Sequence, residues 1–234
     1  MFAEFLRRDE FYQKYMQLLA TRMAIGNVEM ENPNSQGNMA EHYLDIYNNM
    51  EAFRNLIETN KEIITPQDIA QIANRINNGN YKDFRTTQVE VRKATKFYPI
   101  EAMYVIPKMY MIMDNYYKIW NILPIYEKEA RLHIEIVRTQ PFEDGNKRTA
   151  RILTNYNLCK QNKAPIVISG KETEQYFKYI DDYDVEGFAE FLKNKSREEL
   201  EAMMYLYQSI CGDDSFILEE TNPNSIVHVY QKTI

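Results

Sequence analysis

Residues 140–151, with the sequence Gln-Pro-Phe-Glu-Asp-Gly-Asn-Lys-Arg-Thr-Ala-Arg, carry the residue types that most specifically indicate chemistry. Gly145 can adopt the positive φ of a tight turn, and the apolar spacing of Ile152, Tyr156 and Cys159 predicts a helix directly after it. The first turn of a helix points its N–H groups and the positive end of its dipole at the preceding loop. The stretch therefore predicts an anion-binding loop that suits a polyphosphate.

Charged side chains reinforce this interpretation. Lys147, Arg148 and Arg151 place positive charge beside the helix start, where a phosphate would lie. Asp144 lies just before the turn, where its carboxylate can accept hydrogen bonds from the helix N-terminus or hold a magnesium ion that bridges phosphate oxygens. The residues alone leave both roles for Asp144 open.

The string resembles the signature of the Fic (Fic/Doc, or Fido) family, His-x-Phe-x-(Asp/Glu)-Gly-Asn-(Gly/Lys)-Arg-x-x-Arg. Gln140 at the first position is the departure, because the family has a histidine there. Members of the family mostly transfer AMP from ATP to a Ser, Thr or Tyr hydroxyl of a target protein, and the histidine takes the hydroxyl proton. The resemblance implies ATP and Mg²⁺ as cofactors.

The resemblance also implies a role for each residue of the loop. It makes Phe142 the anchor of the loop in the core and Asp144 the Mg²⁺ ligand. It makes Arg151 the residue that reaches the γ-phosphate. The remaining phosphate-binding residues implied are Gly145, Asn146, Lys147 and Arg148, which would surround the α- and β-phosphates.

Gln140 separates several functional hypotheses. A glutamine amide has no basic nitrogen, and loss of a general base typically costs about 10²–10⁴ in rate. The first hypothesis is therefore an AMP transferase of impaired activity, and the second is a non-catalytic nucleotide- or peptide-binding module. A third is a hydrolysis in which Gln140 orients water, as the glutamine of small GTPases does.

Composition narrows the class of protein. The 234 residues, 44% hydrophobic with a net charge of −6, suit one globular domain and lack the basic balance of a nucleic-acid-binding protein. Only Cys159 and Cys211 are present, which favours a reducing, cytoplasmic location. No run of apolar residues is long enough to predict a membrane span. The sequence does not predict an oligomeric state.

The predicted fold is all-α, a Fic-like helical core with a small β-hairpin flap around residues 84–98. We divide it into an N-terminal helical extension (1–80), the Fic-like core (81–195) and a C-terminal helix and tail (196–234). A short strand is expected at 226–230. Outside the helix that follows Gly145, helices are predicted at 2–25, 39–59, from Thr65 to Asn78, 100–121, 126–137, 171–181, 185–193 and 196–208.

The predicted flap depends on a short alternating pattern. Val89 and Val91 alternate with charged residues, which is typical of an extended strand. By resemblance, the flap edge would pair with an extended segment of a target protein, with Val89 and Val91 as target-binding residues. An ordinary hairpin that covers the core explains the same pattern.

Further aromatic and polar residues lie on predicted helices. His133 is expected to be structural, because a lone histidine on an apolar helix face more often finds a buried partner than a substrate. Tyr176 and Tyr179 are expected to pack in the core, although by resemblance an aromatic residue here lines an adenine pocket. Met103, Met109, Ile112 and Tyr116 are assigned to packing.

The end of the first predicted helix resembles an inhibitory segment of the family, in which a glutamate pairs with the second arginine of the signature. Here Ile25 stands at the position of the glutamate. We therefore expect no glutamate lock and, if the helix covers the site, an Arg151 that is free to meet phosphate or solvent. A helix that simply ends at a Gly26 C-cap is the alternative.

Overall fold

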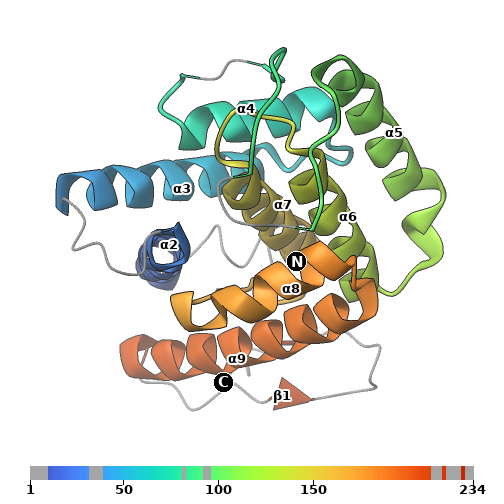
Figure 1. The fold of residues 1–234 in the computed structure, drawn as a ribbon. Helices are drawn as coiled ribbons and strands as arrows, with labels where there is room; N and C mark the ends of the chain where they lie inside the picture. The colour runs from blue at the N-terminus through green and yellow to red at the C-terminus, as the bar shows by residue number, and fades with distance from the viewer. Residues whose placement is uncertain are drawn as a thin grey trace.

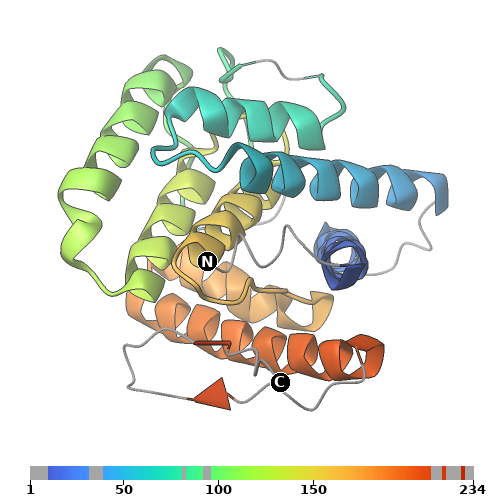
Figure 2. The same ribbon diagram turned by 180° about the vertical axis from the view of Figure 1, so that it is seen from behind.

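A computed structural model describes residues 10–31, 39–80, 83–91, 96–211, 218–219 and 228–229. It is almost entirely helical (Figures 1 and 2). Strands β1 and β2 pair antiparallel, with Leu218 opposite Val229, near the position of the predicted C-terminal strand. The elements are α2 (Glu10–Glu31), α3 (Met39–Thr59), α4 (Pro66–Ile76), η1 (Ala102–Tyr104), α5 (Val105–Lys118), η2 (Trp120–Ile122), α6 (Ile125–Thr139), α7 (Asn146–Lys160), η3 (Gly170–Glu172), α8 (Thr173–Asp182), α9 (Val185–Cys211), β1 (Leu218–Glu219) and β2 (His228–Val229).

Helix α7 lies at the centre, with α6 packed along it (Figure 1). Helices α3 and α4 contact α7, and α5, α8 and α9 contact α6. Almost every residue of α7 is buried, so its polar side chains need partners inside the protein. Asn155, for example, exchanges hydrogen bonds with the backbone of Ile166, at 3.0 and 2.7 Å. The helix that carries the signature arginines is thus fixed on every side.

Helix α4 confirms its predicted start and end. Thr65 caps the helix by accepting a hydrogen bond from the Asp68 N–H, and the Asp68 side chain accepts from the Thr65 N–H in return. Pro66 occupies the first turn, where its missing N–H has no cost. The helix ends at Ile76. Asn77 follows as its C-cap, and its side chain reaches the loop before α7, where it donates to the Asp144 carbonyl.

Helix α2 continues to Glu31, so the predicted stop at Gly26 is wrong. Gly26 has another role: a Cβ at this position would lie 2.2 Å from the carbonyl oxygen of Ile168. The glycine therefore permits close packing of the helix on the segment after α7. Glu199 on α9 accepts hydrogen bonds from Tyr15 at 2.9 Å and Arg22 at 2.8 Å, which joins α2 to α9.

Other predictions of helices need correction. Helix α9 is continuous through residue 195, where two helices were expected, because no residue there breaks the helix. Pro107 lies in the first turn of α5 and introduces no break, since the N–H it lacks would have no partner there. Met103 is exposed because it precedes α5 in η1, outside the buried stripe.

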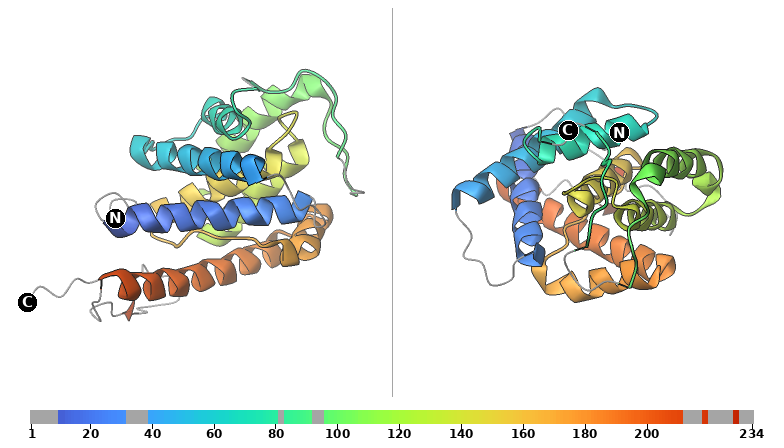
Figure 3. Two further views of the ribbon diagram at one scale, coloured as in Figure 1. Left: turned by 90° about the vertical axis from the view of Figure 1, so that its left-hand side faces the viewer. Right: turned by 45° about the horizontal axis from the view of Figure 1, so that its top comes forward.

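The predicted β-hairpin flap is not found among the described residues. Residues 83–91 and 96–100 form two extended arms, seen in the left panel of Figure 3, but no strand is assigned to these described residues. Residues 92–95 lie outside the described part of the chain. Gln88 Nε2 donates to the Pro99 carbonyl at 3.3 Å, which links the arms by a side chain. No described helix has the length and apolar composition to cross a bilayer.

Candidate functional site

The loop between α6 and α7 begins at Gln140, whose backbone is left-handed with φ 48° and ψ 61°. This conformation is uncommon for a residue with a side chain, so neighbouring contacts must hold it. The Gln140 N–H donates to the Ile136 carbonyl at 3.1 Å, and its carbonyl accepts from Arg85 Nε at 2.6 Å. The chain reversal at the end of α6 thus depends on a residue of the flap region.

Asn146 closes the loop from the other end. Its Oδ1 accepts from the Phe142 N–H, and its Nδ2 donates to the Phe142 carbonyl, both at 2.9 Å. Phe142 is fully buried and stacks on Phe84 with ring centroids 5.5 Å apart. Phe142 therefore anchors the loop, as the resemblance implied, whereas the Asn146 side chain shapes the loop and is already committed to it.

Both ends of the Gln140 amide are also engaged. Its Nε2 donates to the Val137 carbonyl at 2.7 Å, and its Oε1 accepts from Asn146 Nδ2 at 2.9 Å. The side chain folds back on its own helix end. An amide held in this way offers no basic atom, and one N–H and one oxygen lone pair remain for other partners.

Gly145 starts α7 with φ 80°, the left-handed backbone predicted from its place in the sequence. A Cβ here would lie 2.7 Å from Asn77 Nδ2, so the position excludes other residues by space as well as by conformation. The first N–H groups of α7 have no partner within the helix and form the positive end of its dipole. The structure therefore has a helix N-terminus suited to an anion.

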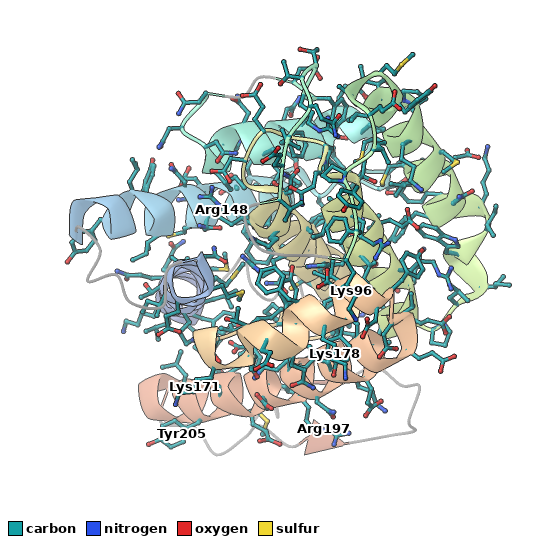
Figure 4. All side chains as sticks on the ribbon, viewed as in Figure 1. Lys96, Arg148, Lys171, Lys178, Arg197 and Tyr205 are labelled. Atoms are coloured by element: carbon teal, nitrogen blue, oxygen red, sulfur yellow. The ribbon has the colours of Figure 1, made fainter. Side chains whose placement is uncertain are left out.

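Arg148 lies in the first turn of α7, beside α3 and α4 (Figure 4). It is 8% exposed, and its Nη2 donates to Asn77 Oδ1 at 3.0 Å and to Asp144 Oδ2 at 3.2 Å. Asp144 is itself 55% exposed and accepts from the Gly145 N–H at 2.7 Å. The guanidinium and the carboxylate are thus brought together at the loop, with Asn77 holding Arg148 from behind.

Arg151 points to a different set of partners. It is 4% exposed, its Nη2 donates to Asn27 Oδ1, and its Nη1 contacts Met30 Sδ at 3.5 Å. Its guanidinium carbon also lies 5.7 Å from the Tyr176 ring centroid. The expectation that Arg151 is left free under the first helix is therefore wrong, because an asparagine two residues after Ile25 reaches it instead.

Ile25 itself is 48% exposed. Glu29, the nearest acidic residue whose side chain is described, accepts from the Gly170 N–H at 2.9 Å and so caps η3. Among the described residues, the acceptors that α2 offers to Arg151 are neutral. The side chain of Glu31, the other acidic residue just downstream of Ile25, lies outside the described part of the chain.

Lys147 is half-buried, and its Nζ lies 5.1 Å from the centroid of the Phe177 ring. This contact is a cation–π pair between α7 and α8 at the edge of the site. It puts an aromatic face and a cation side by side near the helix N-terminus. Phe177, which sequence reasoning passed over in favour of Tyr176, is the aromatic residue of α8 beside Lys147.

The flap arms are organised by Arg85, which sequence reasoning did not single out. This arginine is 3% exposed, and its N–H donates to the Pro141 carbonyl at 2.9 Å. Its guanidinium donates to the carbonyls of Thr87 at 2.8 Å, Ile100 at 2.6 Å and Gln140 at 2.6 Å. The sequence gives no signal for this role, because the acceptors of Arg85 come from segments that only the fold brings together.

The outer end of the flap rests on α8. Lys96 Nζ pairs with Asp182, and Arg138 stacks on the Phe97 ring at 4.9 Å. Figure 4 shows Lys96 beside α8. Val89 and Val91, the predicted target-binding residues, are half-buried on the first arm, so they present only part of their surface.

A metal would have few protein ligands here. Among the described residues no three His, Cys, Asp or Glu side chains gather as a metal cluster. Asp144 is exposed directly before the helix N-terminus, with its two oxygens bonded to the Gly145 N–H and Arg148. This donor set fits Mg²⁺, which typically takes one or two carboxylates and completes its shell with phosphates and water.

Comparison with known proteins identifies a family for part of the chain. Residues 63–158 match the Fic/DOC family, so the chain contains a Fic/DOC family domain. Over 95 residues it is 35% identical to protein adenylyltransferase fic-1 of Caenorhabditis elegans, covering 40% of this chain and 18% of that protein. Over 100 residues it is 25% identical to protein adenylyltransferase Fic of Aedes aegypti, covering 42% and 20%. The match thus spans about a fifth of these relatives.

Solved structures extend the likeness to nearly the whole chain. A Fic domain containing signaling protein from Bacteroides thetaiotaomicron has a TM-score of 0.68 at 16% identity, covering 91% of this chain and 96% of that one. Fic-1 (residues 134–508) from C. elegans has a TM-score of 0.66 at 19% identity, covering 87% and 67%. At these identities the likeness shows the fold, which is the helical Fic fold.

Proposed function

We propose that this chain binds ATP with Mg²⁺ at the loop of residues 140–151 and acts in the manner of an AMP transferase on a protein hydroxyl. The observation that carries the proposal is the pair of buried arginines, Arg148 and Arg151, on the helix whose N-terminus opens at this loop. The curated relatives that match are named protein adenylyltransferases, which supports the same reaction class.

Each residue of the site has a separate role in binding ATP and Mg²⁺. The N-terminal N–H groups of α7 and Arg148 bind the inner phosphates, and Lys147 beside Phe177 marks the end of the site toward α8. Asp144 holds Mg²⁺, which when bound neutralises phosphate charge. Arg151 takes the terminal phosphate once its contacts with Asn27 and Met30 yield to a stronger, charged acceptor.

Transfer in this chain is slow, because Gln140 cannot take a proton. Its amide is bonded to Val137 and Asn146, and a general base at this position is normally worth about 10²–10⁴ in rate. The hydrolytic hypothesis gains nothing from this geometry, since the amide faces its own helix. The runner-up function is therefore a non-catalytic nucleotide- or peptide-binding module.

The target protein presents an extended segment along the first flap arm, with Val89 and Val91 as contacts. Support comes from the arm itself: it is extended, and no described residue pairs with it in a ladder. Extended edges recruit peptide strands through backbone hydrogen bonds. Arg85 joins this arm to Gln140 and Pro141 by hydrogen bonds to their carbonyls. The target hydroxyl binds beside these two residues.

The test uses ATP labelled on the α-phosphate, Mg²⁺, and the wild-type, Gln140→His and Gln140→Leu proteins, with calorimetry of ATP binding on each. We expect all three to bind ATP and only Gln140→His to label itself strongly. Labelling by the wild type at a similar rate would indicate a substitute base. Binding without labelling in any protein would favour the non-catalytic module. Absence of ATP binding would refute the proposal.

A further inference from the structure

Helix α5 is apolar on two opposite sides near its beginning. Its inner side packs on α6 and α4 and consists of buried residues: Val105, Met109, Ile112, Met113 and Tyr116. Its outer side continues from η1 and consists of exposed residues, which we call the α5 face: Met103, Tyr104, Ile106, Pro107, Tyr110 and Met111. A surface helix normally turns polar residues to solvent, and a helix that is apolar all round is normally buried.

The α5 face lies at the edge of the molecule (Figures 1 and 2). Met103 is 71% exposed and Tyr104 53%, whereas Ile106, Tyr110 and Met111 are each 48% or 49% exposed. Their spacing of three and four residues brings these side chains to one side of the helix. Contiguous apolar patches of this kind mark interaction sites, whereas singly scattered apolar residues do not.

The α5 face carries no unpaired charge. The one charged residue between Glu101 and Asp114 is Lys108, which is half-buried and pairs with Glu135 at 2.7 Å. Asp114, at the end of the face, pairs with Lys118 at 2.5 Å on the same helix. A centre without free charge, rich in Tyr and Met and bordered by polar residues, is the composition of a protein–protein interface.

The order of residues along the α5 face is symmetric about Pro107. A tyrosine lies three residues away on each side, Tyr104 and Tyr110, and a methionine lies four residues away on each side, Met103 and Met111. In a two-fold pair, residue i of one copy contacts residue j of the other, and j contacts i. Two antiparallel α5 helices that cross at Pro107 therefore bring tyrosine to tyrosine and methionine to methionine. The occupant that this order fits is a second copy of the chain.

The size of the α5 face also suits such a pair. At roughly 200 Å² for a large side chain, the five exposed fractions amount to about 500 Å² of apolar surface. A standard interface buries about 800 Å² per partner, of which about 56–65% is apolar. The face thus supplies the apolar part of one standard interface, and the polar residues around it supply the rim.

We propose that the α5 face joins two copies of this chain in a two-fold, antiparallel dimer centred on Pro107. Tyr110 is already held for this contact, because Gln67 Nε2 on α4 donates to its hydroxyl at 2.6 Å while the residue stays 49% exposed. A side chain fixed before association loses less entropy when the interface forms. The dimer requires no nucleotide, so it stands apart from the proposed function.

Sedimentation equilibrium of the full chain tests the dimer. Between about 1 and 100 μM the wild type should pass from monomer to dimer or be dimeric throughout, since standard interfaces give micromolar or tighter affinity. Met103→Lys puts a charge against the apolar face of the second copy and should raise the dissociation constant at least about tenfold. Because Met103 is exposed, the variant should keep the helical circular dichroism of the wild type.

The matched control is Tyr47→Lys, which introduces the same charge at an apolar residue of α3 that is 55% exposed. It should leave the dissociation constant within about twofold of the wild type, because a surface substitution outside the interface has little effect.

A double variant tests the antiparallel arrangement. In Met103→Lys/Met111→Glu, each new ammonium group lies opposite a new carboxylate of the second copy, so the dimer should be tighter than with either substitution alone. Positions 103 and 111 of one chain are about 12 Å apart along the helix, too far for a direct pair. A parallel dimer would instead bring like charges together.

A wild type that stays monomeric at about 100 μM would overturn the inference. So would a dimer that persists unchanged in Met103→Lys, or one that Tyr47→Lys dissociates. A double variant weaker than both single variants would overturn the antiparallel arrangement. All of these measurements are made without ATP, so they leave the test of the proposed function untouched.

Discussion

Arg151 on α7 donates from Nη2 to Oδ1 of Asn27 on α2, so the arginine assigned to the terminal phosphate is covered by a neutral amide. An amide accepts a hydrogen bond from a guanidinium but does not neutralise its charge. The contact with Asn27 therefore leaves the charge of Arg151 unchanged while it occupies one of its donors. The contact with Asn27 opposes a phosphate by hydrogen bonding and by space.

Asn27→Asp should convert this contact into a charged one. A carboxylate beside Arg151 would form a charge-assisted pair that a phosphate must displace, so ATP affinity should fall at least about tenfold, or about 1.4 kcal/mol. Asn27→Ala, which removes the acceptor without adding charge, should bind ATP at least as well as the wild type. Calorimetry on both variants tests this, and equal affinities for Asp and Ala would contradict it.

This pair replaces a simpler truncation experiment. If no glutamate lock operates, deletion of residues 1–30 should not raise nucleotide affinity. In the structure α2 buries Phe11, Tyr15 and Leu19 in the core, so deletion would expose that core as well as Arg151. The single substitutions at Asn27 test the contact itself. Asn27→Ala also tests the prediction that no glutamate lock operates.

Arg148→Ala should weaken ATP binding by about 1.5–3 kcal/mol, the usual range for a hydrogen bond to a charged group. Arg54→Ala is the control, since Arg54 lies on the exposed side of α3 and pairs with Glu51 and Glu58. Calorimetry at constant Mg²⁺ gives both values. An unchanged affinity in Arg148→Ala would mean that the nucleotide binds elsewhere.

Arg85→Lys should loosen both flap arms together. A lysine ammonium cannot reach the carbonyls of Thr87, Ile100 and Gln140 from the three directions that the guanidinium covers. Buried carbonyls left without donors cost about 1–3 kcal/mol each, so unfolding should require less urea. Amide hydrogen exchange should rise in 86–91 and 96–101 but not in α9. Faster exchange in one arm alone would contradict the role of Arg85 as their common partner.

Glu129 should make stability depend on pH. Burial raises its pKa to about 7, from 4.5, although Tyr116 and Asn157 donate to it. The folded protein then binds the proton more tightly than the unfolded chain, so the stabilising contribution is complete below about pH 4.5 and is lost as pH rises toward 7. The loss is about 3 kcal/mol.

The comparison that checks this is the difference in unfolding free energy between the wild type and Glu129→Gln, measured in urea from pH 4 to pH 8. The variant cannot ionise at this position, so the difference between the two curves should change in the predicted window and level off outside it. Parallel curves would show that Glu129 has an ordinary pKa in the folded state.

The loop and its helix could be predicted because their signals are local. Gly145 needed a positive φ, Thr65 and Asp68 form a capping box, and α3 runs from Met39 to Thr59 as its apolar spacing indicated. Turn, cap and periodicity are each determined by residues within a few positions of one another. Most of the helices, and the position of the signature at the start of a helix, could therefore be predicted from the sequence.

Contacts between distant segments could not be predicted in this way. Gly26 and Asn27 have the composition of a helix end, yet the glycine admits the Ile168 carbonyl and the asparagine reaches Arg151. Tyr43 and Tyr47 fit an apolar stripe but are exposed, because the helices that pack on α3 leave that end uncovered. Arg85 and Asn77 gained their roles only from the carbonyls and side chains that the fold brought to them.

Glu199 has a consequence for the order in which the protein can form. Tyr15 and Arg22, its partners, precede it by 184 and 177 residues, so this attachment of α2 can form only after α9 has left the ribosome. Contacts this far apart in sequence slow folding because the whole intervening chain must be ordered first. During synthesis α2 can pack against α3, which precedes the signature helix, whereas its attachment through Glu199 must wait for α9.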